Sequence, residues 1–582
     1  NGLTLNGNFS YSRSNQKGSI FGENQTEGAT SAFARTLFLG RNWNLDLPYQ
    51  DANGLPVSTN KAQYDNPLWA FQHNTLTDQT DRYVAGIKLG YQITPWLNAN
   101  YQIGTNNYSF ARRQVVDIGS RGTIVDGAAG LGSMLEQDYR KQEIESNLIF
   151  SLSPKLNNPD FSLTGTLGYN VNQRTINSTA FMGTEIVVPG IYSQSNTKTV
   201  LSDKDNTYVD KRRLWGLFGE ATAGYKGFAY LTLTGRNDWS STLPSDKNSY
   251  FYPSVSGSVV FTDALNLNWG PLDFGKIRAS WAKVGKDADP YSLTSVFQVQ
   301  NPVQGQPAAT LDFLAGNPNL APEFTTDFEI GTQLQFLKNA FTVDFAWYSR
   351  NSTNLIAPIT VPSSSGFNQA FFNIGGLENK GVELELGVTP VKTTDFSLNL
   401  RGIFTKNRSE ITELVTGVQR LTLNAVLTDI SSYLEVGQPF GVLRGSVNVR
   451  DEEGNLLINP TTGMMIRSTE PAVIGDPNPD YKAGLNLGAT YKGFFLNTLF
   501  DLTKGGDIYS VTVSSLLGRG VTKDTEDRET SYIIPGYYGD ENTGLPLLDA
   551  SGNKVRNTTA LSLNEVYFGE TFAINSATEW NV

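Results

Sequence analysis

Few side chains in this sequence could do covalent or metal chemistry. The chain has 582 residues, no cysteine and a single histidine, His73. The lack of cysteine excludes a disulfide framework, a cysteine-ligated zinc site and a thiol nucleophile. One histidine allows no His-Glu zinc motif and only one imidazole base, and we interpret His73, between Gln72 and Asn74, as a loop residue.

Paired carboxylates are the next candidates for chemistry. Glu383 and Glu385 could suggest the acid and base of a glycosidase. They lie two positions apart on one face of a predicted strand. With Asn399 and Arg401 from the next strand, they are better interpreted as the polar wall of a pore, so no catalytic residue is predicted.

One acidic run could bind a cation. Asp451-Glu452-Glu453-Gly454-Asn455 resembles a calcium loop, but no Glu follows at the spacing that an EF-hand requires. We expect a hairpin turn there, as at Asp51-Ala52-Asn53-Gly54 and Asp549-Ala550-Ser551-Gly552-Asn553. No metal site, glycine-rich phosphate loop or cofactor is predicted.

The composition narrows the class of protein. There are 45 Lys and Arg against 56 Asp and Glu, and this net charge of -11 argues against a nucleic-acid partner. Phe 32, Tyr 25 and Trp 9 are too many aromatics for a disordered acidic chain. No run approaches the roughly 18 apolar residues of a spanning helix. A membrane barrel remains possible, because its strands place apolar residues at every second position.

Alternation with a period of two runs through almost the whole chain. Leu3, Leu5, Phe9 and Tyr11 alternate with polar residues, as on a strand with one apolar and one polar face. Fifteen such strands of about ten residues are expected to start near residues 3, 83, 97, 144, 161, 213, 228, 251, 274, 325, 340, 379, 395, 482 and 494.

The connections between these strands alternate between short and long. The seven short ones are 94–95, 153–160, 226–227, 262–273, 337–339, 389–394 and 492–493. The seven long ones are 12–82, 105–143, 172–212, 237–250, 284–324, 351–378 and 406–481. Long loops on one side only are typical of an outer-membrane barrel, which has short periplasmic turns and long extracellular loops.

Aromatic residues add to this prediction. Aromatic residues at the interfacial level form a girdle in membrane barrels, although ordinary cross-strand packing would also explain single pairs. The aromatics that flank the short turns are Trp96, Tyr225, Phe228, Phe336, Phe341, Tyr491 and Phe494. The first long loop holds five more that could contact a substrate or pack the loop itself: Trp43, Tyr49, Tyr64, Trp69 and Phe71. Which residues bind a substrate stays open. The predicted fold class is all-β, a transmembrane antiparallel β-barrel.

Six stretches resemble the SusC/RagA family of TonB-dependent outer-membrane transporters from Bacteroidetes. They are Gly235-Arg236-Asn237-Asp238-Trp239-Ser240-Ser241 with Tyr252-Pro253-Ser254-Val255-Ser256; Lys276-Ile277-Arg278-Ala279-Ser280-Trp281 with Val284-Gly285; Gly316-Asn317-Pro318-Asn319-Leu320-Ala321-Pro322-Glu323; Phe372-Asn373-Ile374-Gly375 through Asn379-Lys380-Gly381-Val382-Glu383-Leu384; Gly475-Asp476-Pro477-Asn478-Pro479-Asp480-Tyr481; and Tyr491-Lys492-Gly493-Phe494 with Lys504-Gly505-Gly506-Asp507-Ile508-Tyr509. Their order and spacing match over roughly residues 230–582.

The resemblance implies a 22-stranded barrel with an amino-terminal plug and a TonB box. Four strands before Asn1 and three after Val582 would complete it, so residues 1–582 are expected to be a partial barrel domain without plug or last strands. The start at Asn1, with no targeting signal, fits an interior piece of a longer chain.

The resemblance also implies a function. We expect a non-enzymatic importer in the outer membrane of a Gram-negative bacterium, in contact with membrane lipid. It would take up oligosaccharides or peptides with a SusD-like lipoprotein lid and with TonB. Two alternatives stay open. One is a SusC-like barrel that is a structural subunit of a larger outer-membrane assembly or secretion complex, and the other is an extracellular β-rich protein that binds or acts on glycans.

Overall fold

The structure is a computed structural model that describes residues 2–20, 31–37, 39–44, 46, 48–57, 65–122, 124, 129–267, 269–415, 417–424 and 430–562. Its main sheet has sixteen strands, all antiparallel to their neighbours. One short strand, β6 (Thr197–Ser202), pairs beside the path of the others, and fifteen follow one another in chain order. They are β1 (Leu3–Ser19), β2 (Thr75–Thr94), β3 (Leu97–Val116), β4 (Ser133–Leu152), β5 (Phe161–Ile186), β7 (Tyr208–Tyr225), β8 (Ala229–Ser240), β9 (Ser249–Val260), β10 (Leu272–Lys286), β14 (Glu323–Phe336), β15 (Phe341–Thr353), β18 (Gly375–Lys392), β19 (Phe396–Leu414), β25 (Pro479–Tyr491) and β26 (Phe494–Gly505).

All fifteen predicted strands are present, but the predicted length of about ten residues is wrong. The strands of the wall contain from 12 residues in β8 to 26 in β5. β4 begins at Ser133, well before the expected start near residue 144. Residues 136–143 are polar on both faces, so alternation cannot reveal a strand there, although the backbone ladder to β3 continues. Most of the extra residues extend toward the long loops, although β18 also continues to Lys392 in a predicted short connection.

The short connections lie at one end of the sheet, as predicted. Two of them are tight Lys-Gly hairpins in which both residues have positive φ, 47° and 75° at Lys226 and Gly227 and 44° and 91° at Lys492 and Gly493. This is the conformation that two-residue hairpins prefer, because it matches the twist of the strands. The connection expected at 262–273 holds an unforeseen helical turn, α3 (Phe261–Ala264).

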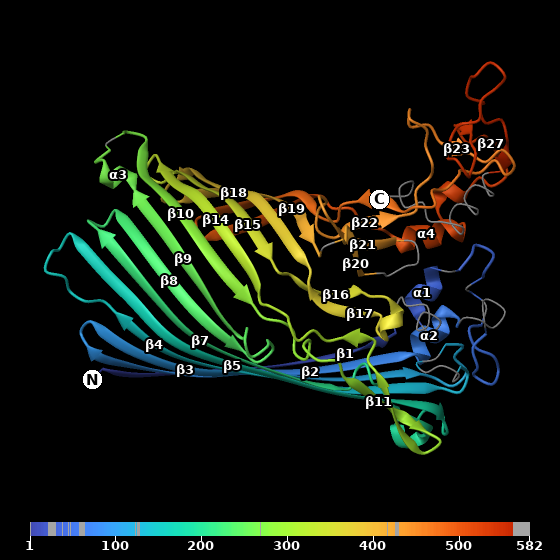
Figure 1. Cartoon of the computed structure of the whole chain (residues 1–582), viewed down its shortest axis with the longest axis horizontal. Coiled ribbons are helices and arrows are strands. Elements are labelled where there is room, and N and C mark those ends of the chain that lie inside the picture. The colour runs from blue at the N-terminus through green and yellow to red at the C-terminus, as the bar shows by residue number, and fades with distance from the viewer. Residues whose placement is uncertain are drawn as a thin grey trace.

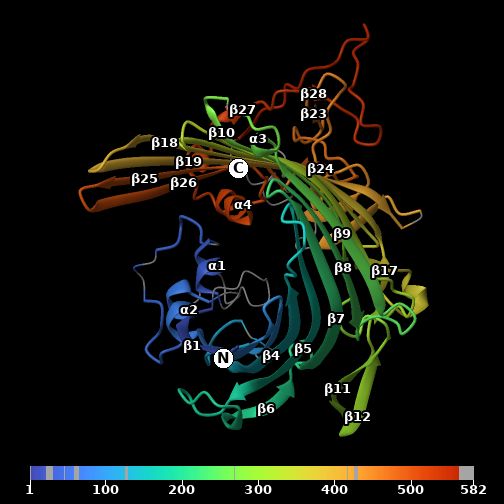
Figure 2. The same cartoon turned by 90° about the vertical axis from the view of Figure 1, so that its left-hand side faces the viewer.

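The wall is an open arc with loop elements at one end (Figures 1 and 2). In the end-on view, α1 (Ala32–Leu37), α2 (Pro67–His73) and α4 (Val511–Gly518) lie on the concave side (Figure 2). The remaining elements are β6 (Thr197–Ser202), β11 (Phe297–Val303), β12 (Gln306–Leu311), β13 (Leu314–Ala315), β16 (Ile356–Thr360), β17 (Gln369–Asn373), β20 (Arg420–Asn424), β21 (Ile430–Glu435), β22 (Val442–Gly445), β23 (Leu457–Ile458), β24 (Ala472–Gly475), β27 (Ser531–Tyr532), β28 (Tyr537–Tyr538), β29 (Leu561–Ser562) and 3-10 turns at Gln194–Asn196, Ser363–Ser365 and Lys523–Thr525.

The apolar residues of the wall are largely exposed. Leu217, Leu231 and Leu233 are 56%, 49% and 53% exposed, although all three belong to the alternating apolar face. The buried clusters lie at the loop end instead, for example the cluster of Leu243, Tyr250, Ala288 and Leu320. A soluble sandwich would bury one face of each sheet against another layer. No helix among the described residues is long and apolar enough to cross a membrane.

Candidate transport lumen and its extracellular rim

The strand register separates an apolar from a polar face. Phe345 on β15 lies opposite Thr332 and Leu384, whereas Asp344 lies opposite Gln333 and Glu385. Because side chains alternate along a strand and opposite residues share a face, the two sets lie on opposite sides of the wall. We call the face that carries Asp344 the lumen face and the face that carries Phe345 the outer face.

Ion pairs cross the strands on the lumen face. Arg278 binds Asp344 at 3.0 Å and Glu329 at 3.4 Å. Arg401 donates two hydrogen bonds of 2.6 Å to the two oxygens of Glu385. A carboxylate held by a guanidinium on both oxygens is poorly suited to act as a proton donor, which argues against the glycosidase interpretation.

Amide side chains extend the polar wall. Asn170 donates to Asn147 at 2.7 Å and to Glu145 at 3.2 Å. Arg236 contacts Asn170 at 3.4 Å and pairs with Asp238 at 2.7 Å. Asn399, predicted to belong to this wall, accepts a hydrogen bond from Thr389. The lumen face thus carries cationic, anionic and neutral groups that can donate or accept hydrogen bonds. Such a surface suits a hydrated polar substrate more than an apolar one.

A buried network fastens the extracellular ends of three strands to one another. Arg212 makes two hydrogen bonds to Asp287, of 2.6 and 2.8 Å. Ser240 and Thr242 also donate to this carboxylate. Burial alone would raise the pKa of Asp287, but the hydrogen bonds from Arg212, Ser240 and Thr242 outweigh it and lower the pKa. Asp287 is 7% exposed and stays ionised, so the network acts as a rigid clamp at the rim.

The aromatics of the first long loop have different environments. Trp69 is 2% exposed, and its indole nitrogen donates to Ser120 at 3.3 Å, so it packs the loop. Phe71 is 61% exposed, and the half-buried Tyr49 donates to Gln72 at 3.0 Å. The indole nitrogen of Trp43 is buried with no partner among the described residues. The fifth candidate, Tyr64, lies outside the described residues.

His73 is not a loop residue, so that prediction is wrong. It ends α2, whose first turn is set by Pro67 and by Asn66, which accepts a hydrogen bond from the backbone N–H of Leu68. The His73 ring stacks on Trp69 with 3.6 Å between ring centroids, and its Nδ1 lies 3.0 Å from Asp117. The Asn-Pro pair before α2 was the available sequence sign of a helix start. His73 packs on Trp69 and contacts Asp117.

A buried carboxyl group holds the same loop together. Asp65 is 0% exposed and accepts hydrogen bonds from the Asn74 side chain at 3.1 Å and from the backbone N–H of Arg121 at 2.6 Å. Burial raises the pKa of Asp65 to about 6, and the hydrogen bonds limit this rise. The group therefore titrates near neutral pH and makes the loop structure sensitive to pH.

The predicted acidic turns are hairpin turns. Asp451 accepts hydrogen bonds from the backbone N–H groups of Glu453 and Asn455, at 3.0 and 2.8 Å. Asp51 and Asp549 make the same pair of bonds two and four residues on. An Asp carboxylate that accepts hydrogen bonds from the backbone N–H groups just after it is typical of the start of a turn. No group of three metal-ligating side chains occurs among the residues that the structure describes.

Two long segments fold together beyond the wall, which the sequence did not reveal. Leu457 and Ile458 of β23 are fully buried and pair in parallel with β28 from the last segment. Lys554 forms ion pairs with Asp451 at 2.7 Å and with Glu453 at 3.2 Å. The first loop also contacts the last segment, through a 2.8 Å hydrogen bond from Arg41 to the backbone oxygen of Thr522. The first loop, residues 451–458 and the last segment are therefore connected by these contacts.

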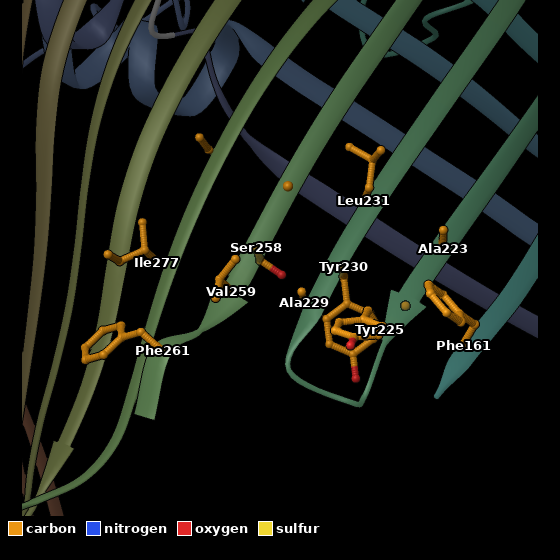
Figure 3. Close-up of a pocket in the computed structure, with 13 residues that line it drawn as sticks. Phe161, Ala223, Tyr225, Ala229, Tyr230, Leu231, Ser258, Val259, Phe261 and Ile277 are labelled. Atoms are coloured by element: carbon orange, nitrogen blue, oxygen red, sulfur yellow. The ribbon is translucent and has the colours of Figure 1, made fainter. Parts of the chain in front are cut away.

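The outer face carries aromatic rings near both of its ends. Trp215 and Trp239 stack with 3.8 Å between centroids at the loop end, and Phe161 and Tyr225 lie 5.0 Å apart at the turn end. Near the turns, small residues leave an apolar hollow of about 620 Å³ between larger side chains (Figure 3). Its outer-face lining is Phe161, Ala223, Tyr225, Ala229, Leu231, Gly257, Val259, Ile277 and Ala279. Amphipathic rings at two levels with an apolar band between them are the pattern of a membrane-facing wall.

These features define one class of protein, the outer-membrane β-barrel. Within that class, the chain matches the family described as TonB dependent receptor-like, beta-barrel, over residues 13–538, and it belongs to that family. The family places this wall in the outer membrane. Membership confirms the predicted fold class and counts against the alternative of an extracellular β-rich protein that binds or acts on glycans. Similarity to SusC confirms the SusC/RagA resemblance.

Several relatives specify the resemblance further. The chain is 24% identical to TonB-dependent receptor P3 of Formosa agariphila over 550 residues, which cover 87% of this chain and 53% of that protein. It is 25% identical to SusC of Bacteroides thetaiotaomicron over 323 residues, 50% of this chain and 31% of SusC. The structure of the RagAB peptide transporter matches with a TM-score of 0.73 at 18% identity, covering 88% of this chain and 57% of that chain. The chain spans about half the length, or less, of the curated relatives it matches.

Proposed function

We propose that the full-length protein imports an oligomeric polar nutrient, an oligosaccharide or a peptide, across the outer membrane. One observation carries the proposal: a wall that is apolar on its outer face and lined with paired charges and amides on its lumen face. A hydrated oligomer could exchange hydrogen bonds with water for bonds to groups such as Arg278, Glu385 and Asn170. The fold similarity to the RagAB peptide transporter supports a peptide cargo, and the resemblance to the SusC/RagA family implies either cargo.

The proposal includes two protein partners. A SusD-like lipoprotein would cover the extracellular mouth, since the long segments lie at that end and already contact one another through Arg41 and Thr522. TonB would supply energy through a region outside these 582 residues. Purification of the tagged full-length protein from native membranes should recover a SusD-like lipoprotein in near-stoichiometric amount.

We further infer that residues 1–582 form part of one barrel domain. Among the described residues, β1 and β26 each have a strand partner on one side only. Apolar residues on these two strands are highly exposed, with Phe9 at 72% and Phe495 at 87%. Long apolar edges of this kind favour pairing with further strands. A density map of the full-length protein should contain a strand against each edge, and an open edge in that map would refute the inference.

Uptake assays test the import proposal. Deletion of the gene should abolish growth on one glycan or peptide source while growth on monomers is unchanged, and uptake of that labelled oligomer should stop when TonB is absent. Complementation with the full-length gene should restore both. Normal uptake of all oligomers by the deletion strain, together with recovery of a large secretion or assembly complex in place of the lipoprotein, would refute it in favour of a structural role.

A further inference from the structure

Two cations flank a tyrosine on the lumen face, on the side of the long loops. Arg82 on β2 lies directly opposite Tyr108 on β3, and Tyr108 lies directly opposite Lys141 on β4. Lys141 shares the lumen face with Glu145, because the two lie at alternate positions of β4. All three residues lie in the halves of their strands nearer the long loops, where a substrate from outside would arrive first. We call Arg82, Tyr108 and Lys141 the Tyr108 row.

An open hollow lies over the Tyr108 row. Its volume is about 310 Å³, and its lining is Arg82, Asn106, Tyr108, Tyr139 and Lys141. The rings of Tyr108 and Tyr139 lie edge to face, with 5.9 Å between centroids and 75° between planes. Pockets for small molecules start at about 300 Å³, so the hollow suits one unit of an oligomer.

The two cations of the hollow are available to an anion. Lys141 is half-buried and forms no ion pair or side-chain hydrogen bond among the described residues. Arg82 is exposed, and its Nε donates one hydrogen bond of 3.0 Å to the uncharged side chain of Asn106. The other N–H groups of its guanidinium fork remain to bind a carboxylate or a sulfate.

The carboxylates that border the hollow have partners of their own. Glu143, on the same face of β4, accepts a hydrogen bond from Asn172 at 2.9 Å and lies opposite Arg174 on β5. Asp78, on the same face of β2, pairs with Arg112 at 2.8 Å. The positive charge of the Tyr108 row is therefore not neutralised by the acids around it.

We propose that the Tyr108 row binds an acidic sugar unit of an imported oligosaccharide, one that carries a carboxylate or a sulfate. A pyranose ring has a face of C–H groups, which the negative face of an aromatic ring attracts, and polar substituents at its edge. Arg82 and Lys141 stand one strand spacing, about 5 Å, to either side of Tyr108, where charged substituents of a stacked sugar would project. The inference rests on the proposed import function and names the class of its cargo.

Acidic peptides are the competing class of cargo. Arg82 and Lys141 alone could bind the carboxylates of Asp and Glu side chains. The ring of Tyr108 between the two cations favours a sugar, because an Asp or Glu side chain has no flat apolar surface to lie on it. Binding of a hexaglutamate peptide therefore distinguishes the two classes.

Titration of labelled oligomers into the full-length protein in detergent tests this assignment. The acidic probes are hexasaccharides of galacturonate, of mannuronate and of sulfated galactose. Cellohexaose and mannohexaose are the neutral probes, and hexaglutamate is the peptide probe. The unmodified protein should bind at least one acidic hexasaccharide ten-fold or more tightly than every neutral hexasaccharide and the peptide.

Two variants and a matched control locate the binding. Arg82→Gln/Lys141→Gln should weaken binding of the acidic hexasaccharide about ten-fold, the loss of one charge-assisted hydrogen bond. Tyr108→Leu should weaken it about five-fold through loss of the aromatic surface. Arg140→Gln/Lys211→Gln removes the same charge from exposed positions of the outer face, on β4 and β7, and should leave binding unchanged.

Several results would overturn the assignment. They are no binding of any acidic hexasaccharide, equal binding of acidic and neutral ones, tightest binding of hexaglutamate, or an equal effect of the double variant and its control. Heat-modifiable mobility on gels verifies folding of each variant. If Arg82→Gln/Lys141→Gln does not fold, Lys141→Gln alone should weaken binding about five-fold.

Uptake assays separate a failure of this inference from a failure of the import proposal. TonB-dependent uptake of a neutral oligosaccharide or a peptide, unchanged by Arg82→Gln/Lys141→Gln, would overturn the inference and leave import intact. Unchanged uptake of all oligomers in the deletion strain would refute import, whereas the titration would still show whether the hollow recognises acidic sugars.

Discussion

Burial should decide what the arginine–carboxylate pairs of this wall contribute to stability. Asp287→Asn and Glu136→Gln each replace by the corresponding amide a carboxylate that binds one arginine of another strand. The Arg212–Asp287 pair is buried, with side chains 23% and 5% exposed, whereas the Arg113–Glu136 pair is 53% and 32% exposed. Asp287 also accepts from two hydroxyl groups, so its loss leaves more groups without a full-strength partner.

The expected free energies follow from this difference. Removing one partner of a buried pair leaves an uncompensated charge and typically costs 3–5 kcal/mol, and because Arg212 is about a quarter exposed we expect about 3 kcal/mol for Asp287→Asn. For the exposed pair, Glu136→Gln should cost less than about 1 kcal/mol. Urea unfolding of the full-length protein in detergent, followed by heat-modifiable gel mobility and tryptophan fluorescence, measures both. Equal destabilisation by the two variants would refute the view that the Asp287 network clamps the rim.

Three further predictions concern the extracellular segments. Trp69→Ala should destabilise the first loop by about 3–5 kcal/mol and so speed hydrogen exchange in residues 67–73. Phe71→Ala changes an exposed residue and should leave the exchange rates unchanged. Equal effects of the two variants would contradict the packing role of Trp69. The pKa of Asp65 is raised from 3.8 to about 6, so its contribution to loop stability is complete below pH 4 and lost as the pH rises through 6. Relative to the intrinsic exchange rate at each pH, residues 65–74 should be less protected at pH 7.5 than at pH 5, and Asp65→Asn should remove this difference. Lys554→Gln should expose the last segment to protease by releasing Asp451, and unchanged cleavage would show that the ion pair does not join the segments.

The wall could be predicted from the sequence because two simple rules govern it. A strand between lipid and a polar lumen must alternate, so Phe341, Val343, Phe345 and Trp347 identified β15 directly. The Lys-Gly turns and the one-sided distribution of loop lengths then fixed the order and direction of the strands. The SusC/RagA motifs added the family, which periodicity alone could not supply.

The structural features that the sequence did not predict follow no such simple pattern. Above the membrane both faces of a strand are wet, so residues 136–143 form a ladder without an alternating pattern. The parallel pairing of Leu457 with Tyr537 joins segments 80 residues apart, and nothing local specifies it. The ion pair of Lys554 with Asp451 and the burial of Trp69 depend likewise on the tertiary fold.

Lipid quenching at two adjacent residues tests the central claim, that this sheet separates membrane from lumen. The 582 residues contain no cysteine, so a fluorophore can be attached to Phe345→Cys or Asp344→Cys in an otherwise cysteine-free full-length background. Phe345 lies on the outer face with Leu384, and Asp344 on the lumen face with its ion pair to Arg278. A nitroxide quencher dissolved in the acyl chains should quench the fluorophore at 345 strongly and the one at 344 little. Equal quenching at the two positions would contradict the assignment of this wall as a membrane barrel.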